Sequence, residues 1–410
     1  MKLKHSDSTA AQNGGAPAPG PWTEACPGDR SRWLQTSEYT PMNVSRILEA
    51  ANEGDIAELA VAAREIQERN WEVIMAMQVR KSALTGLDWR VEPGDDRPES
   101  QNAAKAFENE LKSAGGAPGL KSFHDLIELL MDAVVAPLAA AEIVWGEGGS
   151  LAGFRPVGAW NFTFRGSETP LLVTGDNPCG IPLPPAKFIV HTHGGVFDPA
   201  RAGLIRTLIW LHVFQNYPVK DLVSFVERYG MPFVVAKVDR SAWENERGVM
   251  RNLIRSFGPN GGGVFTKSTE LELLQASNSG GDVYFRLLEY TSRAITKVLL
   301  GQLASSSESS GLSGGDAQSR VRGDLLEADA RAIESTIRNQ LAAPWTEFNF
   351  GSTAAAPVLR FRNPAPEDRA AFAGIIEALH RAGLDADPEE ISARFGISLT
   401  RTTSVQEVQP

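Results

Sequence analysis

Two histidines at the end of one predicted strand are the first residues whose types and spacing could do chemistry. His191 and His193 form an H-x-H pair that closes the run KFIVHTH. Alternation along a strand places both rings on one face, so the pair could supply two ligands to a metal ion. Nearby in the chain, only Asp198 offers a third ligand. Packed or surface histidines are therefore favoured, and we assign no metal site.

Glycine clusters and serines could mark a nucleotide site or a nucleophile. The cluster at residues 258–263 has neither dinucleotide spacing nor the Lys-Ser/Thr of a P-loop, and the one at residues 311–315 does not follow a strand. No serine stands in a G-x-S-x-G motif. We therefore assign no catalytic residue and no cofactor, and we expect a protein that is not an enzyme. Three carboxylates share one predicted helix and are interpreted as its solvated face: Asp324, Glu327 and Asp329.

A mildly basic segment interrupts an otherwise acidic chain. Six cations lie between residues 237 and 267, with Asp239, Glu244 and Glu246 among them. Two interpretations stay open, an ordinary solvated surface and a docking surface for a partner or for DNA. The six cations are Lys237, Arg240, Arg247, Arg251, Arg255 and Lys267.

The C-terminal helix pair, residues 378–397, has the length and spacing of a helix-turn-helix DNA reader. Its second helix begins with the acidic run Asp387-Pro388-Glu389-Glu390. Carboxylates at that end would face DNA phosphates unfavourably, so this interpretation is disfavoured but stays open as an alternative function. Strongly salt-dependent duplex binding by residues 364–410 alone would favour it.

Bulk composition sets limits on the class of protein. The chain has 410 residues, 42% of them hydrophobic, which is enough for about two or three globular units with a core that needs no disulfides. Two cysteines fit a reducing compartment. We expect no signal peptide, no transmembrane helix and no membrane partner. A net charge of −10 disfavours tight non-specific DNA binding but allows a protein that DNA merely passes.

The longest helical pattern runs from Asp198 to Pro232. Asp198 and Pro199 predict its start, Gly230 predicts its end, and Pro218 predicts a kink or two abutting helices. About thirty helical residues span roughly 45 Å, so we expect this element to pack against copies of itself or to bridge domains. One apolar face is marked by Leu204, Leu208, Leu211 and Phe214.

Shorter patterns flank this segment. Residues 1–40 are rich in Gly, Ala, Pro and Ser and predict a flexible arm. The Ser/Gly-rich residues 304–319 predict a long loop, which in a compact domain is typically functional. A helix is expected after this loop, and Pro344 is expected to end that helix. Strands or hairpins are predicted at residues 87–93, 141–145, 152–193, 231–239, 264–275 and 357–362, and further helices at residues 41–85, 99–114, 123–135, 283–300, 319–341, 367–382 and 387–395.

The order of these elements resembles that of the portal proteins of tailed bacteriophages, and most of all the Mu-like group. The likeness runs from about residue 40 to about residue 400. It rests on a combination of segments rather than on any single motif. These segments are RNWEVIMAMQVRKSALTGLDWRV, FHDLIELLMDAVVAPLAAAEIVW, residues 187–233 and LLEADARAIESTIRNQLAAPWTEFNFG.

The resemblance implies an α+β portal fold. Such a fold has an α/β wing, long stem helices, a small β-containing clip, a long helix behind a tunnel loop and a short helical C-terminal crown. Carried over by position, the regions are an arm at 1–40, the wing at 41–197, stem helix 1 at 198–230, the clip at 231–282, stem helix 2 at 283–303, the tunnel loop at 304–319, the long helix and return to the wing at 320–363, and a reduced crown with the tail at 364–410.

The resemblance also implies the function and the site residues. About twelve copies would form a ring at one capsid vertex, through which double-stranded DNA passes during packaging and ejection. Expected partners are the major capsid protein, the terminase large subunit and a head-tail connector, in the virion and, during assembly, in the host cytoplasm. The clip cations above would dock partners, and Leu204, Leu208, Leu211 and Phe214 would form the stem subunit interface. The DNA-facing loop residues would be Ser305, Ser306, Ser307, Ser309, Ser310, Ser313 and Arg320.

An enzyme of unidentified class is the second alternative. An isolated monomer with a deep pocket of titratable groups whose pKa values are shifted would favour it.

Overall fold

The computed structural model divides into two units, Met1–Phe361 and Arg362–Pro410. In the second unit, one helix is described, α11 (Arg369–Arg381). None of the described helices is long and apolar enough to span a bilayer. The structure describes residues 39–116, 119–229, 234–238, 248, 251–252, 262–266, 279–301, 312–362 and 369–381.

Three short helices open the first unit: α1 (Pro41–Asn52), α2 (Ala57–Arg69) and α3 (Trp71–Thr85). Polar side chains cap two of them, since Thr40 Oγ1 accepts from the N–H of Asn43 and Asn70 Oδ1 accepts from the N–H groups of Glu72 and Val73. The alanine-rich α2 is buried on most of its surface, because small side chains let neighbouring elements approach closely.

A three-stranded antiparallel sheet forms the centre of the unit, with strand order β3-β2-β7. The middle strand β2 (Ala139–Trp145) pairs with β3 (Leu151–Val157) and with β7 (Phe188–His191). Six of the seven residues of β2 are buried, which fits its central place. Helices α4 (Pro98–Ser113) and α5 (Phe123–Leu130) belong to the same core.

Short strands complete this part of the unit. β1 (Asp88–Glu92) pairs with β10 (Val358–Arg362), so that residues about 270 positions apart in the chain meet in one ladder. A second three-stranded sheet has the order β4-β5-β6 and lies in a smaller apolar cluster that includes Phe162 and Leu172. Its strands are β4 (Phe162–Thr163), β5 (Leu171–Leu172) and β6 (Ile181–Pro182).

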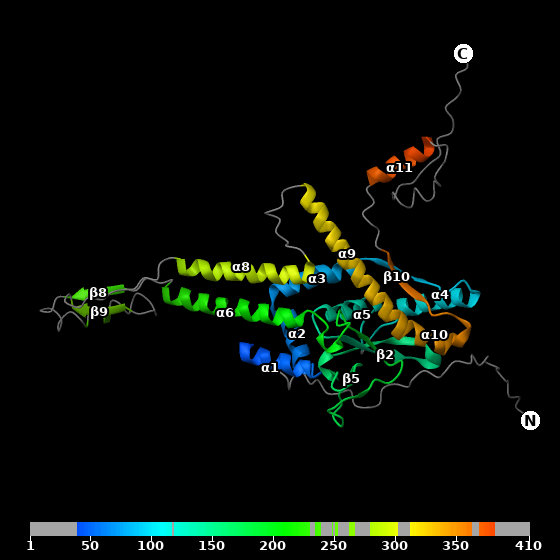
Figure 1. Cartoon of the computed structure of the whole chain (residues 1–410), viewed down its shortest axis with the longest axis horizontal. Helices are drawn as coiled ribbons and strands as arrows, with labels where there is room; N and C mark the ends of the chain where they lie inside the picture. The colour runs from blue at the N-terminus through cyan, green and yellow to red at the C-terminus, as the bar shows by residue number, and fades with distance from the viewer. Residues whose placement is uncertain are drawn as a thin grey trace, which may run out of the picture. The chain divides into compact units, whose positions relative to one another are not determined.

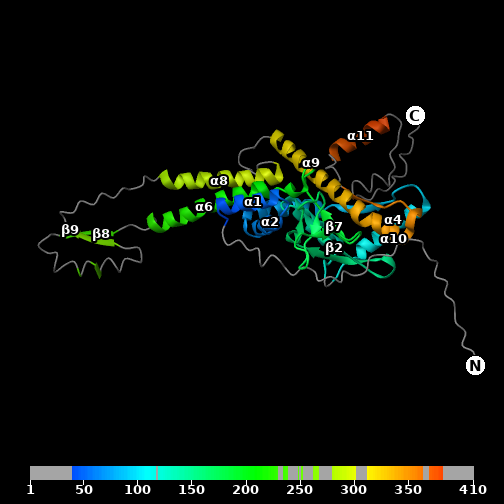
Figure 2. The ribbon, with the colours of Figure 1, turned by 60° about the horizontal axis from the view of Figure 1, so that its bottom comes forward.

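Two long helices lie side by side, α6 (Ile205–Tyr229) and α8 (Ser279–Leu300) (Figures 1 and 2). The prediction that Asp198 starts the first of them is wrong. Asp198 instead caps a single 3-10 turn, η5 (Pro199–Arg201), and Gly203, at φ +76°, redirects the chain before α6 begins. The helix then runs unbroken through Pro218, so it is not two abutting helices.

Between α6 and α8 in the chain, two strands are described, β8 (Val234–Val238) and β9 (Gly262–Thr266). A strand at residues 231–239 was expected, and β8 confirms it. The two strands pair in parallel, whereas the sequence pattern pointed to a hairpin or paired strands at residues 264–275. The rest of that stretch, residues 267–275, lies outside the described residues.

A third long helix, α9 (Leu312–Ile337), runs obliquely to α8 (Figure 1). It passes through a π turn at Arg338–Ala342 into α10 (Ala343–Phe350). The prediction that Pro344 ends the helix is therefore wrong. The π turn shifts the hydrogen-bond register, so that Pro344 stands in the first turn of α10, where a missing N–H costs little.

Candidate functional site: the root of the long helices

The residues predicted to face DNA fall into two groups. Ser305, Ser306, Ser307, Ser309 and Ser310 lie outside the described residues. Ser313 and Arg320 lie in α9, so the prediction of a loop over residues 304–319 is wrong from Leu312 onward. Glycine and serine disfavour helix only weakly, and here the helix that is anchored further along the chain extends through them.

The predicted docking cations are mostly outside the described residues, namely Arg240, Arg247, Arg255 and Lys267. The backbone of Lys237 lies in β8, and Arg251 is exposed. Their role as a docking surface stays a prediction.

The predicted stem face is divided between the chain's own core and solvent. Leu208 is only 1% exposed and packs in the core, so in this conformation it is not available to another subunit. Leu204 and Leu211 are half-buried against the same core. Phe214 is 49% exposed and stacks on Trp210, with ring centroids 6.0 Å apart. Of the four, Phe214 is therefore the one with a large free apolar area.

Phe214 belongs to a wider set of exposed apolar side chains on the long helices and on α3. Large apolar side chains scattered singly are ordinary, but several of them recur along these neighbouring helices. We call this set the stem face: Trp71 and Met75 on α3, Phe214 and Tyr217 on α6, and Phe285, Leu287 and Tyr290 on α8.

Arg80 and Asp329 form a buried ion pair where α3, α8 and α9 meet. Arg80 Nε donates to Asp329 Oδ2 at 2.6 Å and Nη2 donates to Oδ1 at 2.7 Å. Arg80 Nη1 donates to the carbonyl of Leu299 at 2.9 Å, in the last turn of α8. The two residues are 7% and 3% exposed. The interpretation of Asp329 as part of a solvated face is therefore wrong, although Asp324 and Glu327 are exposed as expected.

No sequence pattern predicted this pair, although Arg80 carries a local signal. Arg80 occupies a position on the buried stripe of α3 with Val73, Met77 and Leu84, where an apolar residue is expected. A charge on such a stripe needs a buried partner. The partner stands 249 positions along the chain, which no local pattern identifies.

Both histidines of the H-x-H pair lie against α9, although β7 ends at His191 and His193 follows the strand. His191 Nδ1 lies 2.8 Å from Thr336 Oγ1, and His193 Nδ1 lies 3.9 Å from Asp329 Oδ1. Burial lowers the pKa of His191 to about 4, with a smaller contribution from His193. Burial and the Arg80 charge lower the pKa of His193, partly offset by Asp329. In the described part of the chain, no cluster of three or more His, Cys, Asp or Glu side chains could hold a metal ion.

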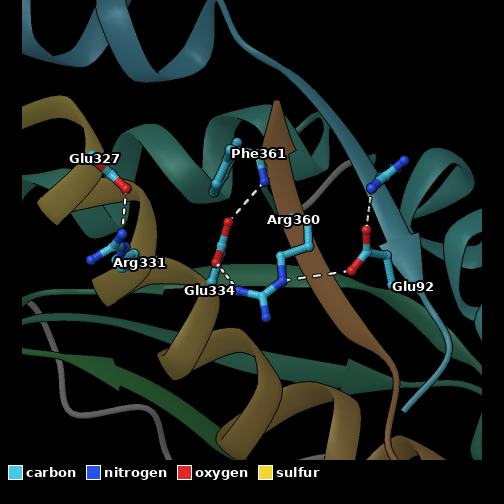
Figure 3. A network of polar contacts seen from close by, with 7 residues as sticks. Glu92, Glu327, Arg331, Glu334, Arg360 and Phe361 are labelled. Atoms are coloured by element: carbon cyan, nitrogen blue, oxygen red, sulfur yellow. Dashed lines mark hydrogen bonds and ion pairs between the residues drawn. The ribbon is translucent and has the colours of Figure 1, made fainter. Parts of the chain in front are cut away.

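A second polar network fixes α9 one and a half turns further on (Figure 3). Glu334 Oε2 accepts from Arg360 Nη1 at 2.8 Å, and Glu334 Oε1 accepts from the N–H of Phe361 at 2.8 Å. Arg360 Nε also lies 3.7 Å from Glu92 Oε2 on β1. This network therefore joins α9 to the β1-β10 ladder.

The π turn supplies a third anchor. Gln340 Oε1 accepts from the N–H of Val190 at 2.7 Å, and its Nε2 donates to the carbonyl of Val190 at 2.8 Å. β7 is an edge strand, so this side chain satisfies backbone groups that the sheet leaves open. A π turn is rare and is often found where a helix must present one side chain.

Residues 321–328 of α9 have fewer buried contacts than the part of the helix from Asp329 onward. Val321, Arg322, Asp324 and Glu327 are exposed, and Glu327 forms a solvent-facing ion pair with Arg331 (Figure 3). A void of about 20 Å³ separates this half from α3 and the end of α8, lined by Val79, Arg80, Ala83, Leu300, Arg322, Leu325 and Leu326. The arrangement is suited to position a segment of the chain.

Comparison with known proteins identifies the family to which this chain belongs. A sequence model described as the portal protein of Mu bacteriophage matches residues 61–397. The chain belongs to this Mu portal family. The expectation of a Mu-like portal protein is thereby confirmed.

Two curated relatives support the assignment. The chain is 27% identical over 351 residues to "Mu-like prophage FluMu protein gp29" of Haemophilus influenzae, which covers 82% of this chain and 66% of the relative. It is 25% identical over 334 residues to the "Portal protein" of Escherichia phage Mu, which covers 79% of this chain and 64% of the relative. The chain thus spans just under two thirds of the length of the curated relatives it matches.

Solved structures confirm the α+β fold. One neighbour comes from "Neck of empty GTA particle computed with C6 symmetry", with a TM-score of 0.51 and 11% identity, and covers 91% of this chain and all of the neighbour. Another comes from "Neck of native GTA particle computed with C12 symmetry", with a TM-score of 0.51 and 10% identity, and covers 90% and 98% of the two chains. At such low identity the likeness concerns the fold alone.

Proposed function

We propose that this protein is the portal of a Mu-like phage or prophage, a ring at one capsid vertex through which double-stranded DNA is packaged and ejected. Membership of the Mu portal family across residues 61–397 carries the proposal. The stem face agrees with it, because apolar side chains left uncovered in one chain are covered when copies pack side by side in a ring.

The ring has about twelve subunits in this proposal, following the twelvefold symmetry in the description of the gene transfer agent neck. Its interface is heterologous, because a ring of more than two subunits joins one surface of each copy to a different surface of the next. The stem face supplies one of these surfaces, with Phe214, Tyr217 and Tyr290 as its aromatic anchors.

The portal acts as a passive channel and not as a motor. Residues 302–311, between α8 and α9, face the DNA, and their serines make weak contacts that do not stall it. Strong phosphate neutralisation would hold the duplex in place, and the acidic balance of the chain avoids it. Energy for packaging comes from a separate ATPase, in line with the absence of a P-loop motif from the sequence.

Residues 231–282 are the proposed contact region for other virion proteins. Their cations would dock the terminase large subunit and then a head-tail connector, while the wing contacts the major capsid protein. This places the protein at the capsid vertex of the virion and in the host cytoplasm during assembly.

A deletion of residues 305–310 tests the channel assignment, because it removes five serines and leaves α9 intact from Leu312. The variant replaces the wild-type gene in the phage. Normal ring yield with at least a tenfold drop in DNA-filled heads is expected. Normal packaging by rings of this variant would remove residues 302–311 from the channel.

A further inference from the structure

One guanidinium binds both helices that flank residues 302–311. Arg80 Nη1 donates to the carbonyl of Leu299, two residues before Gly301, the last described residue of that side. Arg80 Nε and Nη2 hold both carboxylate oxygens of Asp329 on α9. A planar fork with several fixed donors is suited to such a bridge, whereas an ammonium group offers only a point charge.

Gly301 provides a second contact between the same two helices. It ends α8 with φ +69°, and its N–H donates to the carbonyl of Lys297 at 2.9 Å. A Cβ at this position would lie 3.1 Å from Val321 Cγ1 and 3.5 Å from Leu325 Cδ1. Val321, Leu325 and Asp329 follow at four-residue steps, so one row along α9 meets the end of α8.

Stability alone does not account for an ion pair at this place. Taking two charges out of water is costly, and apolar residues of similar volume often serve as well or better. What the pair adds is direction, because a bidentate pair fixes both the distance and the rotation of its partners. Direction matters here, since residues 321–328 of α9 are partly or fully exposed and lie over a void of about 20 Å³.

We propose that Arg80 is a positioning residue for the channel: by bridging Leu299 and Asp329 it sets where residues 302–311 leave α8 and enter α9. This inference rests on the proposed function. It predicts that the ends of α8 and α9 keep one relative position as DNA passes, and that loss of the bridge impairs packaging without dissolving the ring.

The test variant is Arg80→Met with Asp329→Leu. Removing both charges together leaves no unpaired ion in the core, so the chain keeps its fold, but the bond to the Leu299 carbonyl is lost. The matched control is Glu334→Gln with Arg360→Met. This charge pair joins α9 to β10, and Arg360 also lies near Glu92 on β1, but the pair has no bond to α8. Ring mass, melting temperature and packaged DNA per ring are measured for both, beside the deletion of residues 305–310.

The expected result is ring yield within about twofold of wild type for both pairs, with packaged DNA per ring reduced about tenfold or more for Arg80→Met/Asp329→Leu and within about twofold for the control. Wild-type packaging by the Arg80 pair, while the deletion fails to package, overturns the inference and leaves the proposed function standing. Normal packaging by the variant that lacks residues 305–310 would instead overturn the proposed channel role of residues 302–311.

Arg80→Lys covers the case in which the double variant does not assemble. Lysine keeps the charge beside Asp329 but cannot bind both carboxylate oxygens and the Leu299 carbonyl in the same geometry. Rings of this variant are expected to form normally and to package about three- to tenfold less DNA. Wild-type packaging by this variant overturns the inference, and so does failure of both variants to form rings, because Arg80 is then needed for folding alone.

Discussion

The two halves of α9 are parts of one helix but are held in different ways. From Asp329 to Ile337, buried polar contacts join the helix to α3 and β10, and Ile333 and Ile337 are fully buried. From Val321 to Ala328, charges face solvent and a small void lies beneath. The comparison teaches that a long helix can take its position from a few buried groups at one end and leave the other end to its surroundings.

The largest expected difference between the halves concerns single charges. Asp329→Ala leaves Arg80 buried without its partner and should lower the free energy of unfolding by about 3–5 kcal/mol. Asp324→Ala, on the exposed half, should change it by less than about 0.5 kcal/mol. Denaturant unfolding of both variants provides the measurement. Similar values for the two would remove the distinction between the halves.

Acid should weaken the anchored half through His191, which contacts Thr336. Because burial lowers its pKa to about 4, the unfolded chain takes up a proton near pH 6.5 while the folded chain does not. The free energy of unfolding therefore falls as pH drops from about 6.5 to about 4, by up to about 3 kcal/mol for this residue.

His191→Gln should flatten that part of the pH profile in urea unfolding between pH 7 and pH 4. His212 on α6 also has its pKa lowered to about 4 by burial, so His212→Gln should flatten the profile in the same way. An unchanged pH slope in His191→Gln would contradict the assignment of a neutral, buried ring.

The network in Figure 3 should contribute less than the Arg80 pair, because Arg360 is half exposed. Glu334→Ala also leaves the N–H of Phe361 without its acceptor, so a loss of about 1–3 kcal/mol is expected. Glu327→Ala, which breaks only the exposed pair with Arg331, should cost about 0–0.5 kcal/mol. Chemical denaturation measures both, and an equal cost would show that burial of Glu334 makes no difference.

Two glycines provide the smallest contrast, with opposite signs. Gly301→Ala forces a Cβ onto a left-handed residue and towards Val321, so a loss of about 1–2 kcal/mol is expected. Gly323→Ala meets nothing within 4 Å in a helix interior and should stabilise by about 0.5–1 kcal/mol. Thermal unfolding distinguishes the two, and destabilisation by Gly323→Ala would show that the exposed half packs more tightly than described.

Local signals in the sequence predicted most of the helices and strands, but not where some of them begin. The apolar periodicity that includes Leu208 and Leu211 predicted the helix α6. The start of α6 was misplaced because Asp198 caps a separate turn, and the start of α9 because glycine and serine are only weak breakers. The second error arises because a helix anchored further along the chain propagates through residues of weak local preference.

The anchors of α9 could not be predicted in the same way. Arg80 and Asp329 are 249 positions apart, and Gln340 reaches Val190 across 150 positions. Periodicity describes one element at a time, so it can mark Arg80 as an unusual residue on an apolar stripe but cannot name its partner. The same limit explains why Leu208 was assigned to a subunit interface, since its apolar position is equally suited to the chain's own core.

The mass of the purified protein by light scattering, with electron microscopy images of the same fraction, tests directly whether the chain assembles into a ring. Phe214→Ser/Tyr290→Ser serves as the variant, because it removes two anchors of the stem face without touching the core. Wild type is expected to form rings of about twelve subunits with a central hole, and the variant mostly smaller species. A stable wild-type monomer or dimer under conditions that support assembly would contradict it.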